Sequence, residues 1–265
     1  MAFVSWGYFV PDETWQSVEV AHQLVFHQGY LTWEWKHGLR SYLHPLIFAI
    51  PFKLLQIFHI DFPYLIVLVP KLTQALISAT SDSFALKSFE SLFGSKSQHS
   101  LSSKSTFCAL YLSNWFMLYA SSRTVINTLE TCLSTIALSF YAEKDCRYVS
   151  LIAISFMLRP TTAIFWVPMV SANVFQVPMK TFLFQMIPQA LAVIVTSVAI
   201  DSYFYGRLVI GKVHYLLDII KNHPLGGAPK LLIDLSVKIG PFLAFFPHIW
   251  SFFIQFLGSF LSPFW

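Results

Sequence analysis

The chain has 265 residues, of which 55% are hydrophobic and 11% are charged, and its formal net charge is +4. Soluble domains carry roughly 25% charged residues, so the composition excludes an ordinary soluble domain, and its high hydrophobicity excludes a disordered chain. The Lys and Arg residues are scattered and form no basic stripe, which argues against a nucleic-acid partner. The sequence therefore predicts an all-α, polytopic membrane protein that has membrane lipids as partners.

The N-terminal segment, residues 1–41, is predicted to lie at the membrane surface. Apolar residues recur in it at helical spacing, at Trp15, Val18, Ala21 with His22, and Val25. This pattern indicates an amphipathic helix on the surface of the bilayer, which Gly29 is expected to end. Trp33 and Trp35 follow, and tryptophan is enriched at the level of lipid headgroups.

Residues 42–205 are predicted to form a multi-span membrane domain. A spanning helix needs about 20 mostly apolar residues. The stretches that qualify, or nearly do, are 62–86, 106–122, 124–142, 148–175 and 181–205, with one more at 239–262 in a divergent tail, 206–265. The stretch 42–60 is weaker because it carries His44, Pro45, Pro51 and Lys53, and its sequence leaves open whether it crosses.

Charged loops predict the sidedness of these spans. Segment 87–104 is Ser-rich and Lys-rich, so we expect a loop, and short Lys-rich loops favour the cytoplasmic side. If 106–122 and 124–142 form a helical hairpin, the link at 143–147 lies on that same side. Arg123 then lies at the opposite turn.

Two adjacent carboxylates, Asp12 and Glu13, open the predicted surface helix. Acidic residues are favoured at helix N-termini by the macrodipole, which is a sufficient structural explanation. The functional alternative makes one carboxylate a general base. Neighbouring residues of a helix point apart, so only one of the two is expected to act.

The motif around Trp33 and Glu34, followed by Arg40, also has two interpretations. It is either an interfacial aromatic anchor with a snorkelling arginine or a polar platform for sugars. In the second case, the tryptophan face lies under a sugar ring and the carboxylate bonds its hydroxyls.

Ionisable groups within apolar spans are the remaining candidates, because a central Arg or Asp costs about 2.5–3.5 kcal/mol and usually faces a cavity, a partner or a substrate. Arg123, Asn127, Glu130 and Ser134 have the spacing of one helical stripe, which suits either an internal salt bridge or a polar ligand. Arg159 precedes a helix-breaking proline. It is either a snorkelling group at a kink or a cation for a phosphate.

Other charged residues are interpreted more simply. Lys53, Lys71, Asp82 and Asp201 are expected to snorkel or to cap helices. No spacing of His, Cys or Asp fits a metal site, and no Gly-rich nucleotide loop is present, so neither a metal nor a cofactor is expected.

The run FVPDETWQSVEVAHQLVFHQGYLTWEWKHGLRSYLHPLIF, with SRTVINTLET, LRPTTAIFW and IDSYFYG after it in matching order, resembles glycosyltransferase family 22 over residues 9–206. These are the dolichyl-phosphate-mannose-dependent mannosyltransferases, and the likeness is greatest to the branch that acts on the GPI anchor. The resemblance implies a GT-C fold in the endoplasmic reticulum membrane with a lumenal active site. It implies dolichyl phosphate mannose as donor and, as acceptor, a GPI glycolipid that receives its third mannose in α-1,2 linkage.

The resemblance also implies roles for individual residues in an inverting reaction. Asp12, with Glu13 beside it, takes the position of the catalytic base. The other polar residues in or near the membrane are expected to bind substrate. They are Trp33, Glu34, Arg40, Arg123, Asn127, Glu130 and Arg159. The arginines among them are the candidates to stabilise the departing dolichyl phosphate.

Two departures from the family lead us to expect a chain truncated at both ends. Only ten residues precede Pro11, where the family has a membrane span, and the later His-Lys-Glu motif of the family does not occur. Two alternatives therefore stay open. One is a non-catalytic fragment of such an enzyme, and the other is a small-solute transporter, although we find no paired halves that would favour transport.

Overall fold

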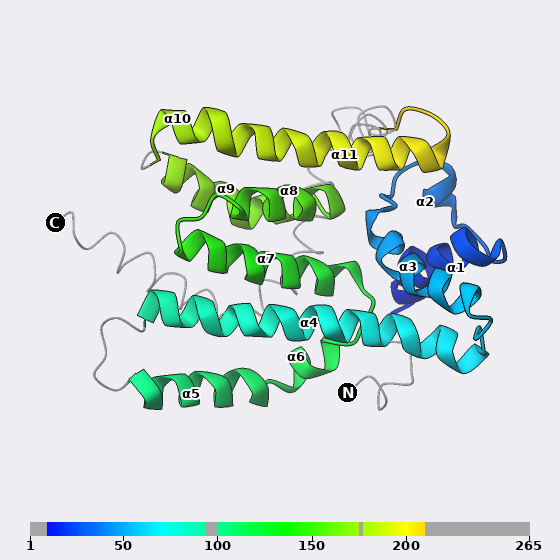
Figure 1. The fold of residues 1–265 in the computed structure, drawn as a ribbon, viewed down its shortest axis with the longest axis horizontal. Coiled ribbons are helices and arrows are strands. Elements are labelled where there is room, and N and C mark those ends of the chain that lie inside the picture. The colour runs from blue at the N-terminus through cyan, green and yellow to red at the C-terminus, as the bar shows by residue number, and fades with distance from the viewer. Residues whose placement is uncertain (1–9, 94–99, 175–176, 210–265) are drawn as a thin grey trace, which may run out of the picture. The chain divides into compact units, whose positions relative to one another are not determined.

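The computed structural model describes residues 10–93, 100–174 and 177–209. They belong to the first of two compact units, residues 1–214. All their regular secondary structure is helical, which confirms the all-α prediction (Figure 1). After a π-helical turn at Thr14–Val18, the helices are α1 (Glu19–Phe26), α2 (Trp33–Lys36), α3 (Leu43–Ile57), α4 (Pro63–Phe93), α5 (Ser100–Ser113), α6 (Trp115–Ala120), α7 (Ile126–Ala142), α8 (Tyr148–Leu158), α9 (Thr162–Val174), α10 (Met179–Thr181) and, after a second π-helical turn at Phe182–Met186, α11 (Ile187–Tyr205).

Helices α4, α7, α8 and α11 pack side by side in that order (Figure 1). Among the described residues, two helical stretches are long and apolar enough to cross a membrane, Pro63–Ser91 within α4 and Met179–Tyr205 through α10 and α11. These match the predicted spans 62–86 and 181–205, and an all-helical chain with two such helices is compatible with a membrane protein.

Of the other predicted spans, 124–142 corresponds to α7, whereas 106–122 and 148–175 are each divided. Stretch 106–122 is not one helix, because the side chain of Asn114 accepts hydrogen bonds from the N–H groups of Phe116 and Met117 and starts a new helix, α6. Stretch 148–175 is divided at Arg159 and Pro160, as the proline predicted. Within 42–60, α3 has 15 residues, about 22 Å, which is shorter than a hydrocarbon core of about 30 Å.

The predicted loop 87–104 is largely helical, because α4 continues to Phe93 and α5 begins at Ser100. Two of its lysines form ion pairs. Lys87 lies 2.9 Å from Glu143, and Lys104 lies 2.8 Å from Glu90. The first pair brings the C-terminal part of α4 next to the 143–147 link, so these two segments lie at one end of the bundle. The cytoplasmic location of both stays a prediction.

The helix after Asp12 forms, but its buried face differs from the predicted stripe. Trp15 is 41% exposed, whereas Ala21 and Val25 pack in an apolar cluster with Phe48 and Phe52 of α3. This face therefore lies against protein and not against lipid. The helix also ends before Gly29, at Phe26, because His27 adopts a left-handed conformation there.

The predicted span 239–262 lies outside the described residues, as does all of the tail 206–265 beyond residue 209.

Candidate active site

The polar residues singled out in the sequence gather where several chain segments meet. The start of the first helical turn, the 121–125 connection before α7, the α8–α9 break and the C-terminal end of α11 all lie toward one end of the bundle (Figure 1). Hydrogen bonds join these segments into three clusters.

The first cluster joins Glu13 to the turn before α7. The carboxylate of Glu13 lies 3.5 Å from the guanidinium of Arg123, and both side chains are buried. The hydroxyl of Thr124 donates to the backbone carbonyl of Glu13 at 3.2 Å, and the hydroxyl of Ser17 donates to the carbonyl of Thr124 at 3.1 Å. Arg123 also donates to the hydroxyl of Tyr119 at 2.6 Å. These contacts fix the N-terminal helix on the bundle.

Asp12 and Glu13 point into different environments, as the helical spacing predicted. Glu13 is 4% exposed, whereas Asp12 is exposed and its carboxylate forms no hydrogen bond or ion pair with the described residues. Of the two carboxylates, Asp12 is thus the one that a ligand can reach.

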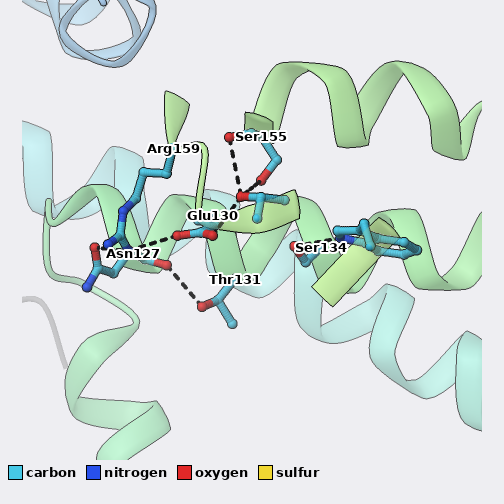
Figure 2. Close-up of polar contacts among 8 residues, drawn as sticks. Asn127, Glu130, Thr131, Ser134, Ser155 and Arg159 are labelled. Carbon is cyan, nitrogen blue, oxygen red and sulfur yellow. Dashed lines mark hydrogen bonds and ion pairs between the residues drawn. The ribbon is translucent and has the colours of Figure 1, made fainter. Parts of the chain in front are cut away.

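The second cluster lies between α7 and the α8–α9 break, and Figure 2 shows it. Arg159 donates from Nη1 to Oδ1 of Asn127 at 2.6 Å and to Oε2 of Glu130 at 2.9 Å. Thr162 donates to Oε1 of the same glutamate at 2.6 Å. Arg159 has the extended backbone that a residue before proline favours, and its side chain remains 30% exposed.

The predicted helical stripe of four residues is only partly correct. Asn127, Glu130 and Ser134 share the face of α7 that contacts α8 and α9, and Ser134 accepts a hydrogen bond from Trp166 (Figure 2). Arg123 is not on that face, because α7 begins only at Ile126. Glu130 accordingly pairs with Arg159, and the salt bridge considered within the stripe does not form.

The third cluster contains Glu34 and Arg40, which form a bidentate ion pair with N···O distances of 2.9 and 3.1 Å. Trp33 beside it is 61% exposed. Trp35, predicted at headgroup level, is buried inside the protein. This side chain is 2% exposed and donates from Nε1 to the carbonyl of Trp15 at 3.3 Å, because α2 packs its second tryptophan against the core.

Sequence reasoning missed several residues that complete these clusters. The roles of Tyr119 and Thr162 could have been predicted only from their neighbours in the fold, because a single hydroxyl residue has no distinctive pattern in the sequence. Asp201, interpreted above as a snorkelling or capping group, instead accepts hydrogen bonds from Ser41 and from the N–H of Tyr42. Burial of Tyr42, and then the charge of Asp201, raise the pKa of this phenol.

The described residues contain no group of three or more His, Cys, Asp or Glu side chains that could hold a metal ion. The three clusters and the residues next to them in sequence offer an exposed carboxylate at Asp12, a partly exposed guanidinium at Arg159, and an ion pair that follows an exposed indole at Trp33. A carboxylate can accept a proton, a guanidinium can hold a phosphate, and an indole face with a planar ion pair suits a sugar.

Comparison with known proteins identifies relatives over most of the chain. Residues 1–217 match the family described as the Alg9-like mannosyltransferase family. The chain is 37% identical over 269 residues to GPI alpha-1,2-mannosyltransferase 3 of Homo sapiens, covering 96% of this chain and 46% of the human protein. It is 39% identical over 230 residues to GPI mannosyltransferase 3 of Drosophila melanogaster, covering 83% of this chain and 38% of that protein. No solved structure matches significantly.

The chain spans less than half the length of these relatives. A further relative, Mannosyltransferase APTG1 of Arabidopsis thaliana, is 35% identical over 221 residues, covering 79% of this chain and 39% of the plant protein. Residues 1–217, which the family matches, include all three clusters.

Proposed function

The chain belongs to the Alg9-like mannosyltransferase family, and from this premise we propose that it performs mannosyl transfer to a GPI-anchor glycolipid. The relatives named GPI mannosyltransferase support this acceptor. The transfer adds an α-1,2-linked mannose, the third of the glycolipid. None of the relatives described above has a transporter name, so transport is not favoured.

The donor in this proposal is dolichyl phosphate mannose. A lipid-linked sugar brings its own activated leaving group, so the reaction needs no nucleotide-binding loop. The acceptor hydroxyl attacks the anomeric carbon of mannose as Asp12 takes its proton. The bond from that carbon to the phosphate oxygen breaks, and dolichyl phosphate departs with the electron pair. Attack from the face opposite the leaving group inverts the anomeric configuration.

The observation that carries this proposal is the contrast between the adjacent carboxylates. Asp12 is exposed, whereas Glu13 is buried against Arg123. A general base has to reach the proton that it abstracts, so the exposed carboxylate is assigned as base and the buried one as its anchor. Positioned general-base catalysis contributes typically about 10²–10⁴-fold to the rate.

The other two clusters are assigned to the donor phosphate and to a sugar ring. Arg159, held by Asn127 and Glu130 and half-exposed, is assigned to the phosphate of the donor. Trp33, with the Glu34–Arg40 pair beside it, is assigned to a sugar ring. Arg123 is buried in its pair with Glu13, and this supports an indirect role, in which it holds the segment that carries Asp12.

We further propose a GT-C fold in the endoplasmic reticulum membrane, with residues 1–41 as a lumenal segment over the multi-span domain 42–205. The position of all three clusters toward one end of the bundle supports a single active site on one side of the membrane. The C-terminal end of α4 and the start of α5 lie toward the other end (Figure 1), and the positive charges of Lys87 and Lys104 on these helices suit a cytoplasmic side.

The test is an in-vitro transfer assay with microsomes that contain the full chain and lack other enzymes of this specificity. The substrates are dolichyl phosphate mannose and a GPI glycolipid with two mannoses. Asp12→Asn is expected to abolish transfer at unchanged expression, whereas Asp145→Asn, a matched change in the exposed link between α7 and α8, is expected to leave it intact. Transfer by the Asp12 variant, or none by the wild-type chain, contradicts the proposal.

A further inference from the structure

The segment that carries Arg40 is attached to the C-terminal end of α11 through three successive residues. The phenol of Tyr205 donates to the carbonyl of Arg40 at 2.8 Å. Oδ1 of Asp201 accepts a hydrogen bond from the hydroxyl of Ser41 at 3.0 Å and another from the N–H of Tyr42 at 2.8 Å. These contacts join parts of the chain that are 159 to 165 residues apart.

Asp201 and Tyr205 are four residues apart and therefore lie on one face of α11. Asp201 is 5% exposed, so its side chain is a buried acceptor, and hydrogen bonds that are shielded from water are stronger than exposed ones. The ring of Tyr42 lies 4.9 Å from each of the rings of Trp35, Phe204 and Tyr205. The segment before α3 is thus held by both a polar and an aromatic contact.

The Glu34–Arg40 ion pair depends on this attachment. Glu34 is on the short helix α2, which has only four residues, and Arg40 is in the irregular segment between α2 and α3. Both side chains are partly exposed, and the free energy of a partly exposed ion pair is small. The pair alone is therefore too weak to hold the two side chains in place. The backbone of Arg40 is instead fixed from outside, by α11.

We propose that Asp201 is a positioning residue for the sugar-binding pair Glu34–Arg40. It holds residues 41 and 42 against α11 and so sets where the guanidinium of Arg40 meets Glu34 beside Trp33. The proposal rests on the assignment of this cluster to sugar in the proposed function. It gives a role at the substrate site to a carboxylate that the sequence indicated only as a snorkelling or capping group.

The first test is independent of transfer. Hydrogen–deuterium exchange of the full chain in detergent is compared between wild type, Asp201→Ala and Asp145→Asn. The amide of Tyr42 is expected to exchange roughly tenfold to a hundredfold faster in Asp201→Ala, because its acceptor is lost, with α7 and α8 unchanged. Unchanged exchange at Tyr42 overturns the proposal, whether or not the chain transfers mannose.

The second test uses the transfer assay. Asp201→Ala is expected to raise KM with a smaller effect on kcat, and Asp201→Asn, which keeps an oxygen acceptor, is expected to retain part of the affinity. If Asp201 acts through Arg40, the double variant with Arg40→Gln loses no more than Arg40→Gln alone. Fully additive losses, or an unchanged KM together with faster exchange, overturn the positioning role. A wild-type chain without transfer refutes the proposed function, and the exchange measurement then decides alone whether Asp201 orders this segment.

Discussion

Glu13 and Arg123 form an ion pair across 110 residues of sequence, with side chains that are 6% and 4% exposed. The pair connects the first helical turn to the connection between α6 and α7. Since Asp12 precedes Glu13 directly, the position of the proposed base depends on a charge that is not itself catalytic.

Glu13→Gln is expected to destabilise the protein, because Arg123 keeps its buried charge and loses the compensating one. Breaking a buried ion pair from one side costs about 3–5 kcal/mol, whereas replacing both partners by apolar residues of similar size costs much less. Thermal unfolding in detergent should therefore show a large loss for Glu13→Gln and a smaller one for Glu13→Leu with Arg123→Met. Equal losses would show that the ion pair is not what anchors this segment.

The two tryptophans of α2 are expected to behave in opposite ways. Trp35→Ala removes a side chain that is 2% exposed and is expected to cost about 3–5 kcal/mol of folding free energy. Trp33→Ala removes one that is 61% exposed and should leave thermal unfolding nearly unchanged, while it raises KM for a mannose-containing substrate. A large stability loss in Trp33→Ala would contradict the assignment of this side chain to a ligand.

Arg159→Lys preserves the charge but removes the planar guanidinium, in which Nη1 alone donates to both Asn127 and Glu130. We expect kcat/KM for transfer to fall roughly tenfold to a hundredfold, because the lysine cannot hold both partners and a phosphate in one geometry. The matched control is Arg147→Lys, an exposed arginine that pairs with Asp145 in the α7–α8 link. Equal activity of the two variants would show that Arg159 does not bind the substrate.

Gly29 and Gly206 provide a comparison of backbone constraints. At Gly29, φ is +135°, and a Cβ would lie 2.7 Å from Oε1 of Glu19, which accepts a hydrogen bond from the N–H of Tyr30. At Gly206, φ is +63°, and a Cβ would meet nothing within 4 Å. Gly206→Ala is expected to cost about 1–2 kcal/mol from the left-handed conformation alone, and Gly29→Ala more. The two melting temperatures in detergent would test this order, and a more stable Gly29→Ala would reverse it.

The sequence by itself determined the helical class, the long apolar helices α4 and α11, and the break at Pro160, because apolar run length and proline chemistry are local properties. It also identified Asp12, Glu34, Arg40 and Arg159 as unusual, since charges near apolar runs are costly wherever they lie. The family of the protein was indicated by motifs that occur in this sequence in the same order as in the family.

Only the tertiary structure decided which charge meets which. Arg123 was assigned by spacing to the stripe of Glu130, yet it pairs with Glu13, because α7 starts three residues after it. Trp33 and Trp35 read alike in sequence, and only the packing of α2 buries the second. Asp201 lies 159 residues from the amide it binds. Such pairings depend on how helices are placed side by side, and periodicity along one chain carries no information about the neighbour that a helix face will meet.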